Sequence, residues 1–450
     1  MKKFILNNIT KLPVFVNKCL LSLNKNASLV YGKTYQKNIS LLLEGNEVSD
    51  PEQLLLNTVN RAIKEVPYYK KRYSGMTIRS VQEFQDRIGF IDKQTVIDHF
   101  DEFINPTINV NDLYELHSTG GSTGQALKIL IPKNRQDYEV STVHYLWNKI
   151  GYAFSTRAVI RGHRLPNSKV FEINPITREF LFDGFRLTDS YFMQVYQVMK
   201  KHQIAFVHAY TYNAYEFARF LIKEQLDTGF IKGFLTASEM VYPYQQSFFD
   251  EFFPGKHYNF YGHTEKLIIA GFTTPSSNDY FFEPHYGFAE LIDDDNQAIR
   301  TPELTGELVA TGFLSPGMPL IRYRTNDYGE YAGNQCPKTG KKGLLLANIL
   351  GRGSEVIYNK DKRGVTTTAL NLHGDLLRYF TLLQYEQHEY GKLRVNLIVS
   401  AIHTPEASTR LMQYLKEKFN PDMQIEFNYL KEAPKLKNGK FLLLKSSLNN

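Results

Sequence analysis

Strand-like and helical segments alternate through the middle of the chain, and this alternation constrains the fold more than any other feature of the sequence. Apolar residues recur at helical spacing in 52–73, where the pattern stops at Pro67, and again in 191–204 and 212–224. Runs typical of strands occupy 127–131, 205–208, 307–311 and 393–400. This order predicts an α/β core.

The length and a pair of glycines indicate more than one domain. The chain has 450 residues, whereas a single hydrophobic core stops growing at roughly 250–300 residues. Gly351 and Gly353 follow an apolar stretch, and glycine permits backbone rotations that other residues resist. We therefore place a hinge at 351–354, between a large domain over 1–350 and a small domain over 355–450.

The composition excludes several classes of protein. Hydrophobic residues make up 42% and charged residues 22%, the balance of a globular rather than a disordered chain. The net charge of +7 is small for this length and comes without a long basic run, so we expect no nucleic-acid partner. The two cysteines, Cys19 and Cys336, are too few for a four-cysteine zinc site or a disulfide framework, which favours a cytoplasmic location.

The apolar residues at the N-terminus do not predict a transmembrane segment. Asn7, Asn8, Lys11 and Pro13 interrupt them, which fits neither a secretory signal nor a spanning helix. A short amphipathic element that contacts a membrane or a neighbouring protein is the alternative. No sequence pattern sets an oligomeric state.

The densest cluster of glycine and hydroxyl residues suits a polyphosphate. It consists of Ser118, Thr119, Gly120, Gly121, Ser122, Thr123 and Gly124. Glycines let backbone N–H groups turn toward one anion, and the hydroxyl side chains add further donors. The residue order is not that of a P-loop. A flexible polar turn is the structural alternative.

The same segment also fits the G-x-S-x-G pattern of a hydrolase nucleophile elbow. In that pattern Ser122, between Gly120 and Gly124, would be the nucleophile. An elbow needs a helix after the serine, whereas the residues that follow are rich in strand formers and end at Pro132. A serine hydrolase is therefore the less favoured interpretation.

Two further segments combine a turn with groups that can hold a nucleotide. In 259–265 a glycine turn separates Tyr261 from Glu265, so an aromatic face can stack on a purine and a carboxylate can bind Mg²⁺. In 322–329, Asp327 beside a turn can accept hydrogen bonds from both ribose hydroxyls. A buried tyrosine at a strand end and a surface Asp–Arg pair are the structural alternatives.

The last candidate is a lysine near the C-terminus. Lys440 follows Asn438 and Gly439, a strong signal for a tight turn. At the tip of a hairpin its ammonium can reach phosphate oxygens. By itself, an exposed turn lysine is the simpler interpretation.

Taken in order, these segments resemble the adenylate-forming superfamily, and within it the branch of phenylacetate–CoA ligases and capsule-biosynthesis adenylating proteins. The matching segments are the phosphate loop, the Tyr-Gly-x-Thr-Glu motif with Gly262 and Thr264, the Asp327 motif, the glycine hinge and the lysine loop. Ser238 and Glu239 match the loop near the nucleotide base. Each motif is modest, but the ordered set is specific.

The sequence departs from the family pattern at three places. Ser354 and Glu355 follow the hinge where a relative often has Asp, and Asn326 stands where Gly or Arg is usual. Gly120 replaces a frequent Ser. None of these changes removes a group that must carry charge, but the change at the hinge bears on the second half-reaction.

The resemblance implies a large N-terminal domain of mixed sheets and helices and a small, mobile α+β C-terminal domain. It also implies ATP-dependent activation of a small carboxylic acid as its acyl-AMP. Transfer to CoA, or to another thiol, amine or hydroxyl acceptor, would follow, as in surface-polysaccharide biosynthesis.

The resemblance further assigns roles to single residues. The segment from Thr119 to Gly124 would hold the β- and γ-phosphates of ATP, and Lys440 would stabilise charge on the α-phosphate. Glu265 would bind Mg²⁺ and Asp327 the ribose. Tyr261 would contact the adenine, and Arg352 the ribose or the hinge.

The motifs do not identify the acid. The aromatic-rich segment 205–217 and the segment 161–163 are candidates to line its pocket, although 212–217 also fits a helix core. An Arg or His in that pocket would favour a polar acid. The functional alternatives are a serine hydrolase using Ser122 and a non-catalytic relative that binds nucleotide.

Overall fold

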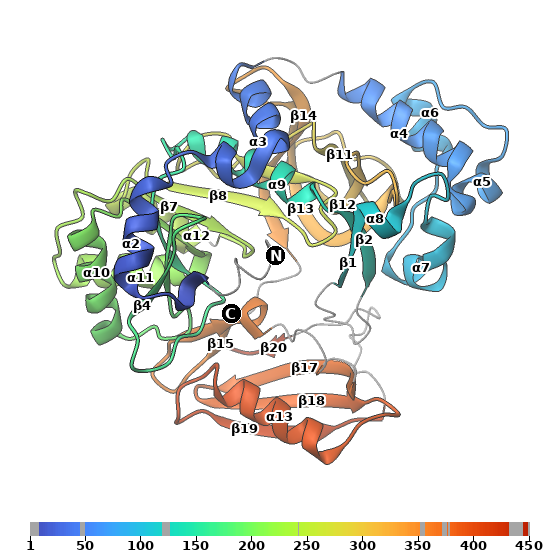
Figure 1. Ribbon diagram of the computed structural model, residues 1–450. Helices are drawn as coiled ribbons and strands as arrows, with labels where there is room; N and C mark the ends of the chain where they lie inside the picture. The colour runs from blue at the N-terminus through green and yellow to red at the C-terminus, as the bar shows by residue number, and fades with distance from the viewer. Residues whose placement is uncertain are drawn as a thin grey trace. The chain divides into compact units, whose positions relative to one another are not determined.

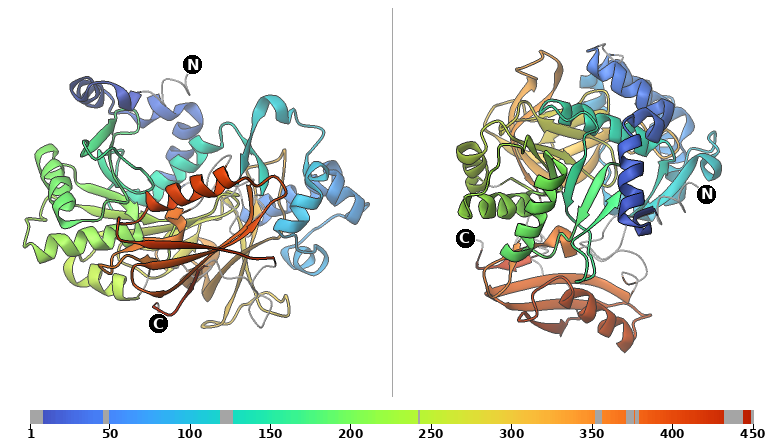
Figure 2. Two further views of the ribbon diagram at one scale, coloured as in Figure 1. Left: turned by 90° about the horizontal axis from the view of Figure 1, so that it is seen from below. Right: turned by 60° about the vertical axis from the view of Figure 1, so that its left-hand side comes forward.

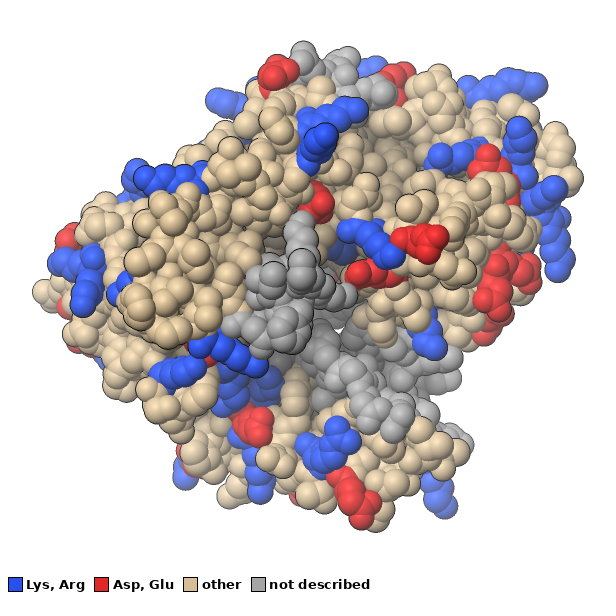
Figure 3. Space-filling model, viewed as in Figure 1, with Lys and Arg blue, Asp and Glu red and all other residues tan. Residues whose placement is uncertain are grey.

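The computed structural model forms two compact units, which are drawn in Figures 1 and 2. The larger unit comprises 1–117 and 129–352, and the smaller unit comprises 118–128 and 353–450. Within them the structure describes residues 9–45, 50–118, 127–241, 243–351, 356–370, 376, 379–431 and 444–448. No helix in these ranges is both long and apolar enough to cross a membrane. On the face drawn in Figure 3, basic and acidic side chains are interspersed over the surface.

A 12-stranded sheet forms the centre of the larger unit. Its strands are β3 (Arg157–Ile160), β4 (Phe171–Asn174), β5 (Glu179–Phe182), β6 (Phe206–Tyr210), β7 (Gly233–Ala237), β8 (His257–Gly262), β9 (Ile269–Phe272), β10 (Tyr280–Phe282), β11 (Gly287–Ile292), β12 (Thr305–Gly312), β13 (Tyr323–Gln335) and β14 (Lys342–Gly351). Their order across the sheet is β11-β12-β13-β14-β10-β9-β8-β7-β6-β3-β5-β4. Pairing is parallel from β5 through β3, β6 and β7 to β8, and antiparallel in the rest.

Different helices cover the two faces of the parallel part (Figure 1). The helices α10 (Asp189–His202), α11 (Thr211–Lys223) and α12 (Pro243–Phe252) connect successive parallel strands, and Phe249 of α12 contacts Phe234 of β7. Phe234 pairs with Val207, so His208, the next residue on β6, points to the other face. There it meets Trp147 of α9 (Arg135–Asn148). The strand–helix alternation confirms the predicted α/β core.

The remaining helices of the larger unit lie mostly in its N-terminal part. They are η1 (Ile9–Lys11), α2 (Val14–Leu23), α3 (Ala27–Leu43), α4 (Pro51–Glu65), α5 (Pro67–Tyr73), α6 (Val81–Arg87), α7 (Lys93–Asp98), η2 (Phe100–Phe103) and α8 (Val110–Leu113). The α3 helix packs on α9. The predicted helix in 52–73 is confirmed in its first part, which forms α4. A second helix, α5, begins at Pro67. Proline is tolerated there because the N–H group that it lacks would have no partner in the first turn of a helix.

The smaller unit is an α+β structure. Its 4-stranded sheet has the order β19-β18-β17-β20. The strands are β17 (Phe380–Glu389), β18 (Lys392–Val399), β19 (Gln424–Tyr429) and β20 (Leu444–Ser446), beside the hairpin of β15 (Val356–Tyr358) and β16 (Gly364–Thr366) and the short η3 (Thr367–Leu370). The helix α13 (Pro405–Lys416) lies along one face of the sheet, where Leu411 and Leu415 join its buried core (Figures 1 and 2).

The predicted fold class is confirmed for both units. The helices predicted at 191–204 and 212–224 correspond to α10 and α11, and the strand predicted at 205–208 corresponds to β6. The strands predicted at 127–131, 307–311 and 393–400 correspond to β2 (Lys128–Pro132), β12 and β18. The hinge and the mobility of the small domain stay predictions, because 352–355 lies outside the described residues.

Candidate functional site

Several of the predicted site residues lie outside the described part of the chain. They are Thr119, Gly120, Gly121, Ser122, Thr123, Gly124, Arg352 and Lys440. Ser118 is exposed at the end of β1 (Tyr114–Ser118), and the next element that the structure describes is the strand β2. A nucleophile elbow requires a helix at that point, so this order counts against the hydrolase interpretation of Ser122.

Tyr261 and Asp327 are in direct contact although they are distant in the sheet. Tyr261 lies in β8 and Asp327 in β13, with β9, β10 and β14 between them. In a flat sheet, strand spacings of about 4.8 Å would place these strands roughly 19 Å apart. The Tyr261 hydroxyl instead donates a 2.7 Å hydrogen bond to Asp327 Oδ2, so the sheet curls and brings the two strands together.

Glu265 is held by two hydrogen-bond donors. The Tyr323 hydroxyl donates to Oε1 at 3.0 Å, and His263 Nδ1 lies 3.1 Å from Oε2. His263 Nε2 accepts from the backbone N–H groups of Leu267 and Ile268, both at 3.3 Å, which places the ring proton on Nδ1. The Glu265 side chain is only 8% exposed, so both contacts fix the direction of its carboxylate.

The surroundings of Glu265 fit a magnesium ion that arrives with a phosphate ligand. Magnesium is usually bound by one or two carboxylates together with substrate phosphates and water. Among the described residues there is no group of three or more side chains that could hold a metal ion. Glu265 can contribute one carboxylate to such an ion.

The segment predicted to lie near the nucleotide base is fixed at both of its named residues. Ser238 follows β7 with a φ of 71°, a conformation that is uncommon for serine. Its hydroxyl accepts a 3.1 Å hydrogen bond from Arg161. The Glu239 carboxylate accepts a 3.0 Å hydrogen bond from the backbone N–H of Tyr212, in the first turn of α11, where the helix dipole favours negative charge. Gly262 and Thr264 of the neighbouring motif are exposed.

A cavity of about 460 Å³ lies beside these segments in the larger unit. Its wall is built from α3, β1, β2, α9 and the parallel sheet, and the lining residues are Tyr31, Glu115, His117, Ile131, Pro132, Lys133, Gln136, Glu139, Val140, Val143, His144, Trp147, Arg157, His208, Phe260 and Lys266. This volume is within the usual range for small-molecule sites. His117 directly precedes Ser118, and Phe260 directly precedes Tyr261. The cavity therefore adjoins both predicted nucleotide motifs along the chain.

The inner part of the cavity carries buried polar side chains. Arg157 forms an ion pair with Glu179, which compensates its charge. His208 is neutral, because burial and then the nearby Arg161 and Arg157 guanidinium groups hold the pKa of its imidazole well below its ordinary value. His144, whose pKa burial also lowers, lies 2.9 Å from the Tyr35 hydroxyl.

The sequence patterns predicted the lining of the cavity only in part. Of the proposed pocket segments 161–163 and 205–217, only His208 lines the cavity, and 212–217 forms the buried beginning of α11. Sequence analysis missed α9 and therefore Trp147. The available signal was that Trp147 is the single tryptophan of the chain, in a segment where Val140 and Val143 precede it at helical spacing.

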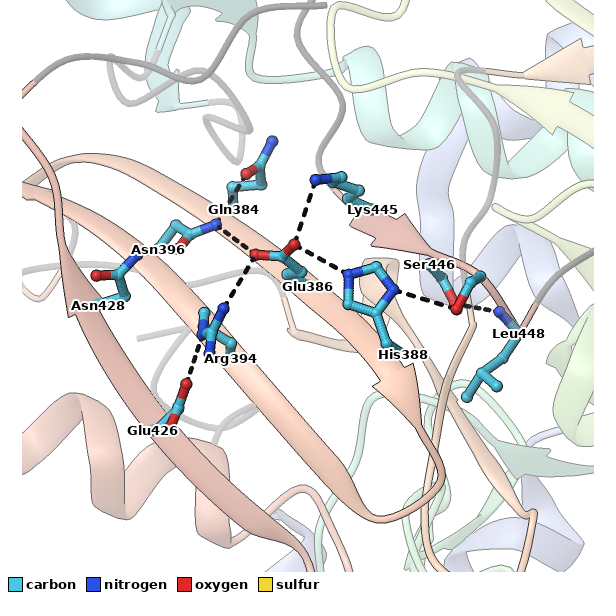
Figure 4. A network of polar contacts seen from close by, with 11 residues as sticks. Gln384, Glu386, His388, Arg394, Asn396, Glu426, Asn428, Lys445, Ser446 and Leu448 are labelled. Atoms are coloured by element: carbon cyan, nitrogen blue, oxygen red, sulfur yellow. Dashed lines mark hydrogen bonds and ion pairs between the residues drawn. The ribbon is translucent and has the colours of Figure 1, made fainter.

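A polar network in the smaller unit anchors β20, the strand that follows the segment containing Lys440 (Figure 4). Glu386 of β17 is its centre and lies 3.3 Å from Lys445 Nζ and 3.0 Å from His388 Nε2. Asn396 donates to the same carboxylate at 3.4 Å. These hydrogen bonds, with that of His388 the strongest, hold the pKa of Glu386 below its ordinary value. The network therefore helps to hold β20 beside β17.

Comparison with known proteins shows two kinds of similarity. Residues 358–447 match the family model described as the CapK C-terminal domain. The chain is also 20% identical over 442 residues to Protein CapK of Staphylococcus aureus, covering 91% of this chain and 92% of that protein. These matches confirm the predicted similarity to proteins of the CapK type.

Solved structures with a similar fold are adenylate-forming enzymes. The structure of 2-hydroxyisobutyryl-CoA ligase in complex with 2-HIB-AMP and CoA, in the thioesterification state, has a TM-score of 0.58 and 13% identity, with coverage of 90% of this chain and 91% of that chain. The same ligase with R3-HIB-AMP, in the postadenylation state, has a TM-score of 0.52 and 14% identity, with coverage of 88% and 89%. The chain therefore has the adenylate-forming fold that its motifs predicted.

Proposed function

We propose that the chain is an AMP-forming ligase that uses ATP to activate a small carboxylic acid as its acyl-AMP. A carboxylate oxygen of the acid attacks the α-phosphorus of ATP, the bond from that phosphorus to the bridging oxygen breaks, and pyrophosphate leaves. Because the protein takes no covalent part, catalysis consists of positioning and charge neutralisation.

The position of the cavity carries this proposal. His117 and Phe260 on its wall are the chain neighbours of Ser118 and Tyr261, which open the two motifs assigned to ATP. An acid in the cavity therefore lies beside the residues that directly precede both segments in the chain. The fold shared with 2-hydroxyisobutyryl-CoA ligase, which was solved with an acyl-AMP, supports the same assignment.

The predicted site residues receive the following proposed roles. Asp327, aligned by the Tyr261 hydroxyl, accepts hydrogen bonds from the ribose, and the Tyr261 ring contacts the adenine. Glu265, held by Tyr323 and His263, provides a carboxylate for Mg²⁺ that is bound to the phosphates. The other ATP contacts are assigned to Ser118, Thr119, Gly120, Gly121, Ser122, Thr123, Gly124, Ser238, Glu239, Gly262, Thr264 and Arg352, with Lys440 at the α-phosphate.

A second half-reaction would pass the acyl group to an acceptor. CoA is one acceptor of the proposed enzyme, since the related ligase structure contains it, and another thiol, an amine or a hydroxyl is the alternative. The similarity to Protein CapK supports a role in surface-polysaccharide biosynthesis, in the cytoplasm where ATP is available.

Exchange of labelled pyrophosphate into ATP tests the first half-reaction. The exchange should depend on one member of a broad panel of carboxylic acids and on Mg²⁺. Absence of exchange with every acid, together with retained ATP binding, would identify a non-catalytic nucleotide-binding relative. Labelling of Ser122 by a fluorophosphonate would instead support the hydrolase.

A further inference from the structure

We propose that the cavity selects acids whose tail carries an uncharged oxygen substituent, such as a hydroxyl, carbonyl or ether, which accepts hydrogen bonds from Trp147 and His208. This inference rests on the proposed function, because it takes the cavity as the site of the acid. It goes further by naming the polar group that the acid must carry.

His208, a residue of the cavity wall, carries a buried hydrogen-bond donor. Arg161 lies 2.9 Å from His208 Nε2, and a guanidinium can only donate, so Nε2 is the acceptor of this bond. The ring proton of the neutral imidazole is therefore on Nδ1. That atom is buried and has no hydrogen-bond partner among the residues that the structure describes. His208 itself lines the cavity.

Trp147 carries a second buried donor in the same wall. Its Nε1 is buried without a partner in the described part of the chain, and its side chain lines the cavity from α9. The Trp147 and His208 rings meet with centroids 4.9 Å apart at an interplanar angle of 66°. In such an edge-to-face contact at most one ring can direct an N–H group at the other, so the contact leaves at least one donor unpaired.

The third unpaired buried polar atom among the cavity residues is also a donor. It is Nε of Arg157, whose guanidinium is paired with Glu179. Three N–H groups on residues that line the cavity thus lack an acceptor among the described residues. An acceptor oxygen on the ligand would remove the free-energy cost that an unpaired buried donor carries. Because Glu179 already compensates the charge of Arg157, an uncharged oxygen fits this wall better than a second carboxylate.

Pairs of acids with the same carbon skeleton test the inference in the wild-type protein. Pyrophosphate exchange is measured for 4-hydroxyphenylacetic against phenylacetic acid and for 3-hydroxybutyric against butyric acid, with further pairs of the same kind. The oxygenated member of the productive pair should have a kcat/KM roughly 10- to 100-fold higher, because the other member leaves the donors unpaired. Equal values in every productive pair would overturn the inference and leave the adenylation proposal intact.

Trp147 also provides a direct measure of binding, because it is the only tryptophan of the chain. Both acids of a pair are titrated while the fluorescence of Trp147 is recorded. The oxygenated acid should reach its half-maximal fluorescence change at a concentration at least about tenfold lower than the matched deoxy acid requires. This readout needs no catalysis. If no acid supports exchange, the adenylation proposal fails, while selective quenching still upholds the polar recognition and unselective quenching overturns it.

Two variants distinguish the effect of losing the Trp147 donor from the effect of changing the shape of the cavity. Trp147→Phe removes the indole N–H and keeps an aromatic ring, so the preference for the oxygenated acid should fall by about tenfold. Val143→Ala changes the same wall without removing a donor, so it should affect both acids of a pair alike. Retention of the full preference in Trp147→Phe would remove Trp147 from the recognition. If that variant does not fold, the wild-type comparison decides.

Discussion

The hydroxyl of Tyr261 donates a 2.7 Å hydrogen bond to Asp327, across a sheet in which three other strands lie between their own. This bond fixes one oxygen of the carboxylate and orients the other. It also ties the Tyr261 ring to the residue assigned to the ribose. The pair therefore forms the centre of the proposed nucleotide site.

Loss of Asp327 should weaken ATP binding. Asp327→Ala removes charge-assisted hydrogen bonds to the ribose, which are typically worth about 1.5–3 kcal/mol, so the Kd for ATP should rise roughly 10- to 150-fold in calorimetry. Tyr261→Phe keeps the ring and removes only the bond to Asp327, so its effect should be smaller, at about 1 kcal/mol. An ATP affinity that is unchanged in Asp327→Ala would remove that residue from the ribose role.

His263 should control the response to magnesium through Glu265. His263→Phe removes the Nδ1–H donor at 3.1 Å and leaves the carboxylate less well oriented. Groups that orient a metal ligand commonly change metal affinity by about 10- to 100-fold, so the Mg²⁺ concentration for half-maximal exchange should rise within that range. Binding of ATP without Mg²⁺ should stay near wild type.

The same titration distinguishes a role in orientation from one in folding. A merely destabilised protein would lose activity at every Mg²⁺ concentration, whereas excess Mg²⁺ should rescue His263→Phe. Glu265→Gln, which removes the charge itself, should not be rescued. Identical Mg²⁺ curves for wild type and His263→Phe would show that the His263 contact does not influence the metal.

The sequence predicted the motifs but not how they meet. The strand β8 ends in Tyr261 and Gly262, and β13 contains Asp327, as the local patterns indicated. Their contact depends on the curl of a sheet over several intervening strands, and local patterns carry no information about such long-range curvature. The same limit applies to Tyr323 and Glu265, which also meet across the sheet.

The cavity was harder to predict because α9 is buried on two sides. It packs between the sheet and α3, and its buried residues include Ser141, Thr142 and His144 as well as Leu146 and Trp147. A helix of this kind has no single apolar stripe, so the periodicity that revealed α10 and α11 is weak here. Of its buried polar residues, His144 contacts Tyr35 and Ser141 accepts a hydrogen bond from Asn38.

Acid should destabilise the larger unit through its buried histidines. Burial lowers the pKa of His257 from 6.5 to about 3, so below pH 6.5 the unfolded chain binds a proton that the folded chain does not. Stability is therefore highest above pH 6.5 and falls as the pH decreases. One such histidine contributes a slope of up to about 1.4 kcal/mol per pH unit.

Removal of His257 should make this pH dependence shallower. His257 contacts Thr236 and Gln246, and His257→Gln retains an uncharged polar group for them. Urea unfolding followed by the fluorescence of Trp147, which lies in the same unit, should show a smaller loss of stability between pH 6 and about pH 4 than in wild type. Parallel curves for the two proteins would mean that His257 takes up its proton in the folded state.

Lys440 should matter for the first half-reaction alone. If its ammonium contacts the α-phosphate only while the acyl-AMP forms, the interaction belongs mainly to the transition state. Lys440→Ala should then reduce acyl-AMP formation by about 100-fold or more, as for loss of one preorganised charge donor, with little change in ATP affinity. Transfer from preformed acyl-AMP to the acceptor should persist.

Lys445 provides the matched control for this variant. It lies five positions further along the chain, and its ammonium is bound to Glu386 rather than assigned to the substrate. The Lys445 side chain is 59% exposed, so Lys445→Ala should leave both half-reactions within about twofold of wild type. Equal losses of activity in the two lysine variants would indicate a general effect on β20. Equal losses of the two half-reactions within Lys440→Ala would instead mean that Lys440 does not act specifically in adenylation. A selective loss of adenylation in Lys440→Ala, with Lys445→Ala unaffected, is the result expected if Lys440 stabilises charge on the α-phosphate.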